Sequence, residues 1–191
     1  DDAASLSRYL APARPEGRAG RPLRGLRVGW RERLHDEPVG NAILPPIVKA
    51  LRVLEDLGAS VERATGEVEQ PLPIWRTLQH AIWMERHGHR ASTSAPLDPV
   101  IAAGIAHARS LGAGDLQAAL HGRTRLFRQV QGWFGSFDIL VTPTLARTPL
   151  PAGHPGSGEI EIDGRAVGDI RAAWAPMLGL FTMTGQPAIS V

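Results

Sequence analysis

The sequence predicts an α/β protein, on the evidence of three consecutive segments. Residues 26–30 alternate apolar and polar side chains, which is typical of a strand. Residues 41–57 repeat apolar side chains at helical spacing. Residues 59–62 then predict a second strand. A strand–helix–strand succession is typical of a crossover unit that joins two parallel strands.

The predicted helix over residues 41–57 has matching signals at both ends. Pro45 and Pro46 fit only its first turn, because proline lacks the amide that later turns need. Gly58 suits the C-terminal cap. The segment before this unit, residues 11–25, is rich in Pro, Gly and Arg and predicts an irregular connection. The apolar positions of the helix are Leu44, Ile47, Val48, Leu51, Leu54 and Leu57.

The middle of the chain predicts three helices. The first carries an apolar stripe between residues 74 and 83, the second spans residues 99–111, and the third is a long amphipathic helix over residues 115–134. Asp115 is the expected N-cap of the third, because its carboxylate can accept from the free amides of the first turn. The stripe consists of Ile74, Trp75, Leu78, Ile82 and Trp83, and the apolar face of the long helix of Leu116, Leu120, Phe127, Val130 and Phe134.

The last third returns to strands and loops. Residues 139–141 predict a strand, and residues 148–170 an irregular connection that holds a small hairpin around Asp163 and Gly164. Residues 172–180 predict a helix and residues 188–191 one more strand. The sequence begins inside a helical pattern and stops on an apolar strand, so we expect a piece of a longer protein.

Composition narrows the class of protein. The 191 residues, 43% hydrophobic and 21% charged, suit one globular domain or most of one. No apolar run approaches the roughly 18 residues needed to cross a membrane, and the first residues show no export signal, so a cytoplasmic protein is expected. Cysteine is absent, which excludes disulfides and thiol chemistry. The 21 basic and 19 acidic side chains nearly balance, which argues against direct nucleic-acid binding.

Few local motifs indicate chemistry. The sequence lacks a G-x-S-x-G elbow, a phosphate loop and a dinucleotide G-x-G-x-x-G motif. The Gly-Ser-Gly stretch at residues 156–158 favours a flexible loop. Glu85, His87 and His89 could bind a metal ion, but their spacing at a helix end favours a surface terminus, so no metal ion or cofactor is expected. The other histidines show no pairing pattern: His35, His80, His107, His121 and His154.

For some charged and aromatic side chains the sequence favours a structural role over a functional one. Lys49, the single lysine, lies opposite the apolar side of its helix, so it stays protonated and is not a general base. Three arginines lie on the polar side of the long helix, a pattern that predicts a solvent-exposed face and not an anion-binding site. Trp75, Trp83 and Met84 favour core packing over a ligand pocket. The three arginines are Arg123, Arg125 and Arg128.

Two segments carry a resemblance to a known family. FDILVTPT, residues 137–144, resembles the "fDvLltPt" segment of amidase signature enzymes, and FTMTGQPAISV, residues 181–191, resembles their "fNltGhPAisvP" segment, in the same order. Weaker resemblances lie at residues 2–6, 23–30 and 53–61. The chain, residues 1–191, therefore resembles the C-terminal portion of one amidase-signature domain.

The resemblance implies a fold and an activity. The fold is a three-layer sandwich in which helices flank a mixed central sheet. The activity is hydrolysis of a carboxamide C–N bond through an acyl-enzyme, with a serine nucleophile, a second serine and a neutral lysine as base. In the family these groups lie in the N-terminal half, so this chain holds no catalytic residue and is expected to be inactive alone.

The resemblance also implies where substrate binds. Thr142, Pro143 and Thr144 end a predicted central strand, where α/β proteins place their ligands. Pro143 ends the strand and makes its rim rigid. The second expected wall segment contributes Phe181, Thr182, Gly185 and Gln186. The alternative for both segments is a plain strand end without ligand contact.

Three functions remain open on the sequence. The first is the C-terminal part of an amidase, whose partners are a small amide substrate and the N-terminal half of the same polypeptide. The second is a subunit like the A subunit of tRNA-dependent amidotransferases. The third is a non-catalytic α/β domain.

Overall fold

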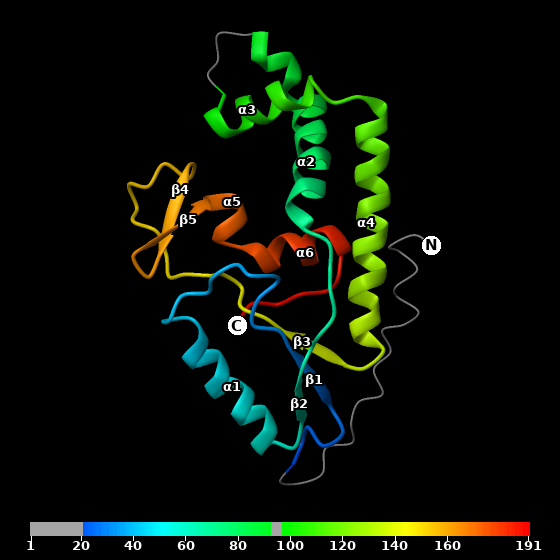
Figure 1. The fold of residues 1–191 in the computed structure, drawn as a ribbon, viewed down its shortest axis with the longest axis vertical. Helices are drawn as coiled ribbons and strands as arrows, with labels where there is room; N and C mark the ends of the chain where they lie inside the picture. Colours follow the sequence, from blue (N-terminus) through cyan, green and yellow to red (C-terminus); the bar gives the residue numbers. More distant parts are fainter. Residues whose placement is uncertain (1–20, 93–96) are drawn as a thin grey trace.

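The computed structural model describes residues 21–92 and 97–191, so the predicted elements and the resemblance within residues 1–20 lie outside the described residues. It confirms the α/β class, with a parallel sheet flanked by helices (Figure 1). None of the described helices is both long and apolar enough to span a bilayer. The elements are β1 (Arg27–Trp30), α1 (Leu44–Asp56), β2 (Ser60–Arg63), α2 (Pro71–His87), a 3₁₀ turn η2 (Gly88–Ser92), α3 (Pro99–Ala108), α4 (Ala113–Phe134), β3 (Ile139–Val141), β4 (Glu159–Ile162), β5 (Arg165–Asp169), α5 (Ile170–Ala173) and α6 (Pro176–Thr184).

The sheet has the strand order β2-β1-β3, and both strand pairs are parallel. β1 lies in the centre, with Trp30 opposite Arg63 on one side and Val141 on the other. Antiparallel pairing among the described residues occurs in the separate β4–β5 hairpin and not in this sheet. All three strands of the sheet therefore end at the same edge.

One face of the sheet packs against α1. Val28 and Trp30 point to this face because side chains alternate along a strand, and they form a buried cluster with Leu51 of α1 and Ala59. Lys49 is exposed on the opposite side of α1, as predicted. The helix begins at Leu44, and Gly58 takes a positive φ of 103° after its end.

The other face of the sheet packs against α4 and α6. Gly29 lies on this face, where an added Cβ would come within 2.6 Å of the Phe137 ring and 2.8 Å of Leu140. Both of these side chains pack on the largest core cluster, so the sheet lies between α1 and the α4–α6 layer. The buried members of that cluster are Leu34, Val68, Leu126, Val130, Trp133, Met177 and Leu180.

The predicted hairpin is present and its turn has a simple physical cause. Asp163 and Gly164 both take positive φ values, 52° and 76°. A two-residue turn with this geometry matches the twist of antiparallel strands and favours Asp-Gly. Ile160 of the hairpin is buried against Ile170 and Ala173 of α5.

Two predictions for the C-terminal third are wrong. The helix expected over residues 172–180 is divided into α5 and α6. Pro176 starts a new helix, because it has no backbone N–H to donate a hydrogen bond to the previous turn. The strand expected over residues 188–191 is not formed. This segment forms no ladder with any described strand, and Ile189 is 88% exposed.

The long helix α4 also differs from its prediction. Its N-cap is Gly112, and Asp115 is the third helical residue, whose carboxylate accepts from the Gly112 N–H at 2.8 Å. Leu120 is 46% exposed, because contacts with α2 and α6 turn a neighbouring face of the helix inward. The buried residues of α4 are Ala119, Gly122, Leu126, Val130 and Trp133.

Candidate functional site

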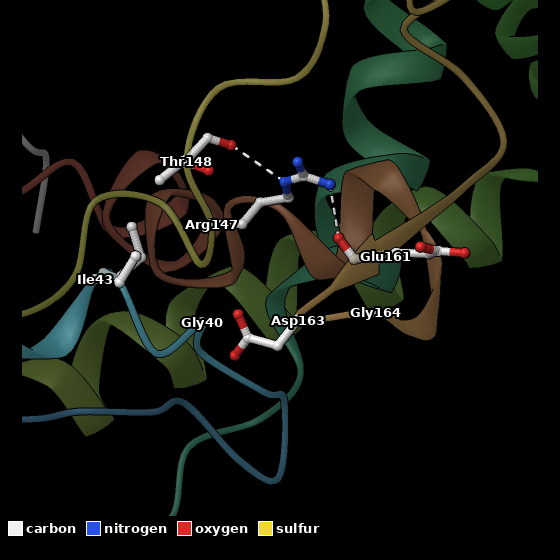
Figure 2. A pocket seen from close by; sticks show the side chains of 8 residues that line it. Gly40, Ile43, Arg147, Thr148, Glu161, Asp163 and Gly164 are labelled. Atoms are coloured by element: carbon white, nitrogen blue, oxygen red, sulfur yellow. Dashed lines mark hydrogen bonds between the residues drawn. The ribbon is translucent and has the colours of Figure 1, made fainter.

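A polar pocket of about 250 Å³ lies between the hairpin and the start of α1 (Figure 2). The Arg147 and Asp163 side chains in it already have partners. Arg147 donates from Nη1 to the Glu161 carbonyl at 2.7 Å and from Nε to the Thr148 carbonyl at 3.1 Å. Asp163 accepts from the Asn41 N–H at 2.8 Å. These contacts connect the hairpin with Arg147 and with Asn41, which lies just before α1, so the two side chains have a structural role.

A larger pocket, of about 530 Å³, lies at the carboxyl ends of β1 and β2. Ligands of open α/β sheets bind at this edge, and the volume suits a small molecule. Its lining contains no residue of the two expected wall segments. The lining residues are Trp30, Arg31, Glu32, Arg33, Arg63, Ala64, Thr65, Gly66 and Glu67.

Arg31 holds this edge of the sheet together. Its guanidinium donates to the carbonyls of Arg33 at 3.0 Å, Leu34 at 2.7 Å and Gly66 at 2.7 Å. It also lies 4.9 Å from the ring centroid of Trp133. Partial burial lowers the pKa of Arg31, an effect that the charge of Glu37 opposes. Because its donors are used on backbone carbonyls, Arg31 shapes the edge of the sheet.

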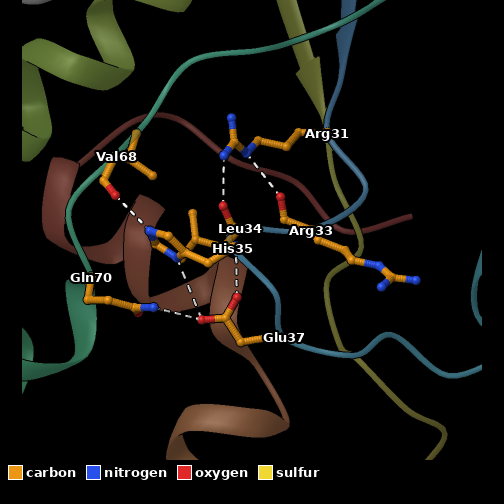
Figure 3. Close-up of polar contacts among 7 residues, drawn as sticks. All are labelled: Arg31, Arg33, Leu34, His35, Glu37, Val68 and Gln70. Carbon is orange, nitrogen blue, oxygen red and sulfur yellow. Dashed lines mark hydrogen bonds and ion pairs between the residues drawn. The ribbon is translucent and has the colours of Figure 1, made fainter.

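A second polar network ties the loop after β1 to the segment before α2 (Figure 3). His35 contacts the Val68 carbonyl through Nε2 at 2.7 Å, while its backbone N–H donates to Glu37 at 2.8 Å. Gln70 donates to the other Glu37 oxygen at 3.0 Å. Desolvation raises the pKa of Glu37, but the hydrogen bonds from Gln70 and His35 outweigh it, so the pKa is lowered overall.

The first expected wall segment lies at the same edge. The Arg31 N–H donates to the Val141 carbonyl at 3.0 Å, so residues 142–144 leave the sheet beside the loop that follows β1. Pro143 is buried, Thr142 is half-buried and Thr144 is exposed. These positions place the segment on the rim of the sheet, next to the larger pocket.

The second expected wall segment begins as the end of a helix, because α6 continues to Thr184, beyond the predicted end at residue 180. Phe181 and Thr182 belong to the last turn of α6, with Phe181 packed on the large core cluster and Thr182 exposed. Gly185 ends the helix in the left-handed conformation, with a φ of 66°, and its N–H donates to the Phe181 carbonyl at 2.9 Å. Gln186 follows, and its Nε2 is buried without a hydrogen-bond partner within residues 21–92 and 97–191.

The structure brings together the ends of the two motif segments, residues 137–144 and 181–191. The hydroxyl oxygens of Thr144 and Ser190 lie 3.1 Å apart. The sequence predicted both segments but not this contact, which joins residues distant in the chain.

The remaining candidates fall into two groups. Glu85, His87 and His89 do not come together as metal ligands, since the described part of the chain holds no group of three metal-binding side chains. The arginines of α4 are exposed, as predicted, and two of them have contacts. Arg125 forms an ion pair with Glu69, and Arg123 donates to the Met183 carbonyl at 2.8 Å.

Sequence reasoning missed one pair of histidines. The Nδ1 atoms of His80 in α2 and His107 in α3 lie 3.0 Å apart. Trp83 stacks on His80, and Trp75 contacts both of these rings edge-on. Both tryptophans are half-buried, but Met84 is 40% exposed, so the predicted core packing is wrong for Met84. No spacing rule connects residues on two different helices, so this pair carried no signal in the sequence.

Comparison with known proteins shows a similarity of fold. Neither protein-family models nor curated protein sequences match this chain. Among solved structures, a bacterial aryl acylamidase of the amidase signature family matches with a TM-score of 0.67 and 23% identity, over 85% of this chain and 36% of that chain. An amidase matches with a TM-score of 0.74 and 17% identity, over 85% of this chain and 37% of that chain. The chain has the fold of just over a third of these enzymes.

Proposed function

We propose that this chain is the C-terminal part of an amide hydrolase of the amidase-signature type. The contact between Thr144 and Ser190 carries the proposal, because it joins the two segments that resemble the family motifs. The fold shared with two amidases supports it. The nucleophile and the base come from the rest of the polypeptide.

In this proposal the chain supplies one wall of the acyl site. Thr142 and Pro143 form a rigid rim at the end of β3, and Phe181 contributes apolar surface from α6. Gln186 has the clearest polar role, because its buried Nε2 is a donor without a partner in the described residues. A buried donor without a partner is costly, and a substrate oxygen would satisfy it.

The direct test measures ammonia release from simple carboxamides by the complete polypeptide. Release without any further protein supports the hydrolase. Release only with a second protein supports the transamidation alternative, and no release under either condition supports a non-catalytic domain.

Gln186→Leu tests the wall. The KM for a carboxamide should rise about 2- to 10-fold, because one hydrogen bond to the substrate is lost. The folded state should not lose stability, because leucine leaves no unsatisfied donor. Gln117→Leu is the matched control, since Gln117 lies exposed on α4 and contacts His121. An unchanged KM for Gln186→Leu would remove Gln186 from the site and leave the hydrolase proposal standing.

A further inference from the structure

We propose that His80 and His107 form a proton-sensitive contact between α2 and α3, which we call the clasp. It holds α3 on α2 while at most one of the two rings is a positively charged imidazolium, and it releases α3 when both rings are. The proposal is independent of the hydrolase function. It starts from the 3.0 Å distance between the two Nδ1 atoms.

At this distance one nitrogen must donate and the other must accept. A neutral pair satisfies this with one ring protonated at Nδ1 and the other at Nε2. A singly protonated pair also satisfies it, because the imidazolium donates to the neutral ring. Two imidazolium rings would place two N–H donors and two positive charges face to face. The second proton therefore binds the closed pair less readily than it binds two separated rings.

The packing around the pair limits the clasp to the contact between α2 and α3. Gly104 of α3 sits so close to α2 that an added Cβ would lie 2.4 Å from the Trp83 ring and 2.9 Å from the His80 ring. His80 stacks on Trp83 with 5.3 Å between ring centroids and 24° between planes. The Trp83 ring is therefore covered by α3 only while the two helices stay at this distance.

The charges around the pair agree with this reading. Burial lowers the pKa of His80, and the nearby His107 and Arg76 lower it further. Arg76 lies on α2 itself, and α3 contributes no ionisable side chain besides His107. The adjoining turn η2 adds His89 and Arg90. α4 and α6 also pack on α2. On α4, His121 contacts Gln117 and Arg125 pairs with Glu69, and α6 carries no ionisable side chain.

The sign follows from this shift. Well above the ordinary histidine pKa of about 6.5, two separated rings take up no added proton, so α3 keeps its full attachment. As the pH falls below that value, two rings that have separated bind more protons than the pair in contact. The attachment of α3 therefore weakens in acid.

Hydrogen exchange of the complete polypeptide tests the clasp. After correction for intrinsic rates, amides of residues 99–108 should exchange about 10- to 30-fold faster at pH 5 than at pH 7.5. One excluded proton changes the opening constant about tenfold for each pH unit below the ordinary histidine pKa of about 6.5. Amides of α4 should not change. His107→Gln keeps a hydrogen-bonding side chain but cannot be protonated, so α3 exchange should become independent of pH. His121→Gln is the matched control and should keep the acid response.

Two results would overturn the clasp. One is equal protection of residues 99–108 in the unaltered protein at both pH values, and the other is an acid response that persists in His107→Gln. If His107→Gln loosens α3 at every pH, NMR titration of the unaltered protein decides. The clasp requires the second proton to bind the pair about one pH unit or more below the ordinary histidine value, and uptake of both protons near pH 6.5 would contradict it.

Discussion

Thr144 and Ser190 lie 46 residues apart in the chain, yet their hydroxyl oxygens are 3.1 Å from each other. Thr144 follows the end of β3, and Ser190 belongs to the extended segment after α6. Because β3 pairs with the central strand β1, this contact ties the extended segment to the carboxyl edge of the sheet.

The contact can be measured with a double-mutant cycle in the complete polypeptide. Thr144→Val and Ser190→Ala each remove one hydroxyl and should together show a coupling free energy of about 0.5–1.5 kcal/mol in urea unfolding. Both side chains are exposed, so the lower end of this range is expected. Strict additivity would mean that the two segments are held together by other contacts.

Gly29→Ala should destabilise the fold by about 1–3 kcal/mol, because the added methyl group overlaps the Phe137 ring. Gly132→Ala is the matched control. Gly132 lies inside α4 with no atom within 4 Å of an added Cβ, so alanine should stabilise the helix by about 0.5–1 kcal/mol. Thermal unfolding measures both changes, and a neutral Gly29→Ala would show that β1 can move away from Phe137.

Arg31→Lys should destabilise the fold by about 2–4 kcal/mol. Lysine keeps the charge but cannot reach the carbonyls of Arg33, Leu34 and Gly66 together, and a hydrogen bond to a charged group contributes about 1.5–3 kcal/mol. Arg33→Lys is the control, because the exposed Arg33 side chain forms one surface ion pair, with Glu32, and its change should stay within about 0.5 kcal/mol. Equal losses in the two variants in urea unfolding would contradict a special role for Arg31.

Glu37→Gln should remove part of the acid sensitivity of folding. The pKa of Glu37 is lowered from its ordinary value of 4.5, so its contribution to stability is complete above pH 4.5 and is lost as the pH falls through the lower folded pKa. The variant should thus be less stable than the unaltered protein at pH 7, and the difference should close in acid. Urea unfolding at several pH values measures it. A difference that stays constant down to pH 2 would show that the charge of Glu37 is unimportant.

Several elements followed directly from local sequence. Residues 139–141 were predicted as a strand and form β3 with the same bounds. These residues are apolar, and Pro143 prevents the strand from continuing. The hairpin followed from Asp163 and Gly164, whose backbone preferences select one turn type. The exposure of Lys49 followed from its position on the polar side of α1.

The errors have a common origin in tertiary contacts. Leu120 was assigned to the buried face of α4, but α2 and α6 cover a neighbouring face. Residues 188–191 have the composition of a strand, but a strand also needs a neighbour for its backbone hydrogen bonds, and no described strand pairs with them.

The candidate site shows the same division. The residue patterns alone determined the α/β class, the end of β3 at its proline and the two segments that resemble amidase motifs. Only the tertiary structure decided that Thr144 meets Ser190, that Gln186 keeps a buried donor without a partner in the described chain, and that His80 faces His107. Local preferences act over a few neighbouring residues, whereas these contacts depend on how whole helices and strands pack.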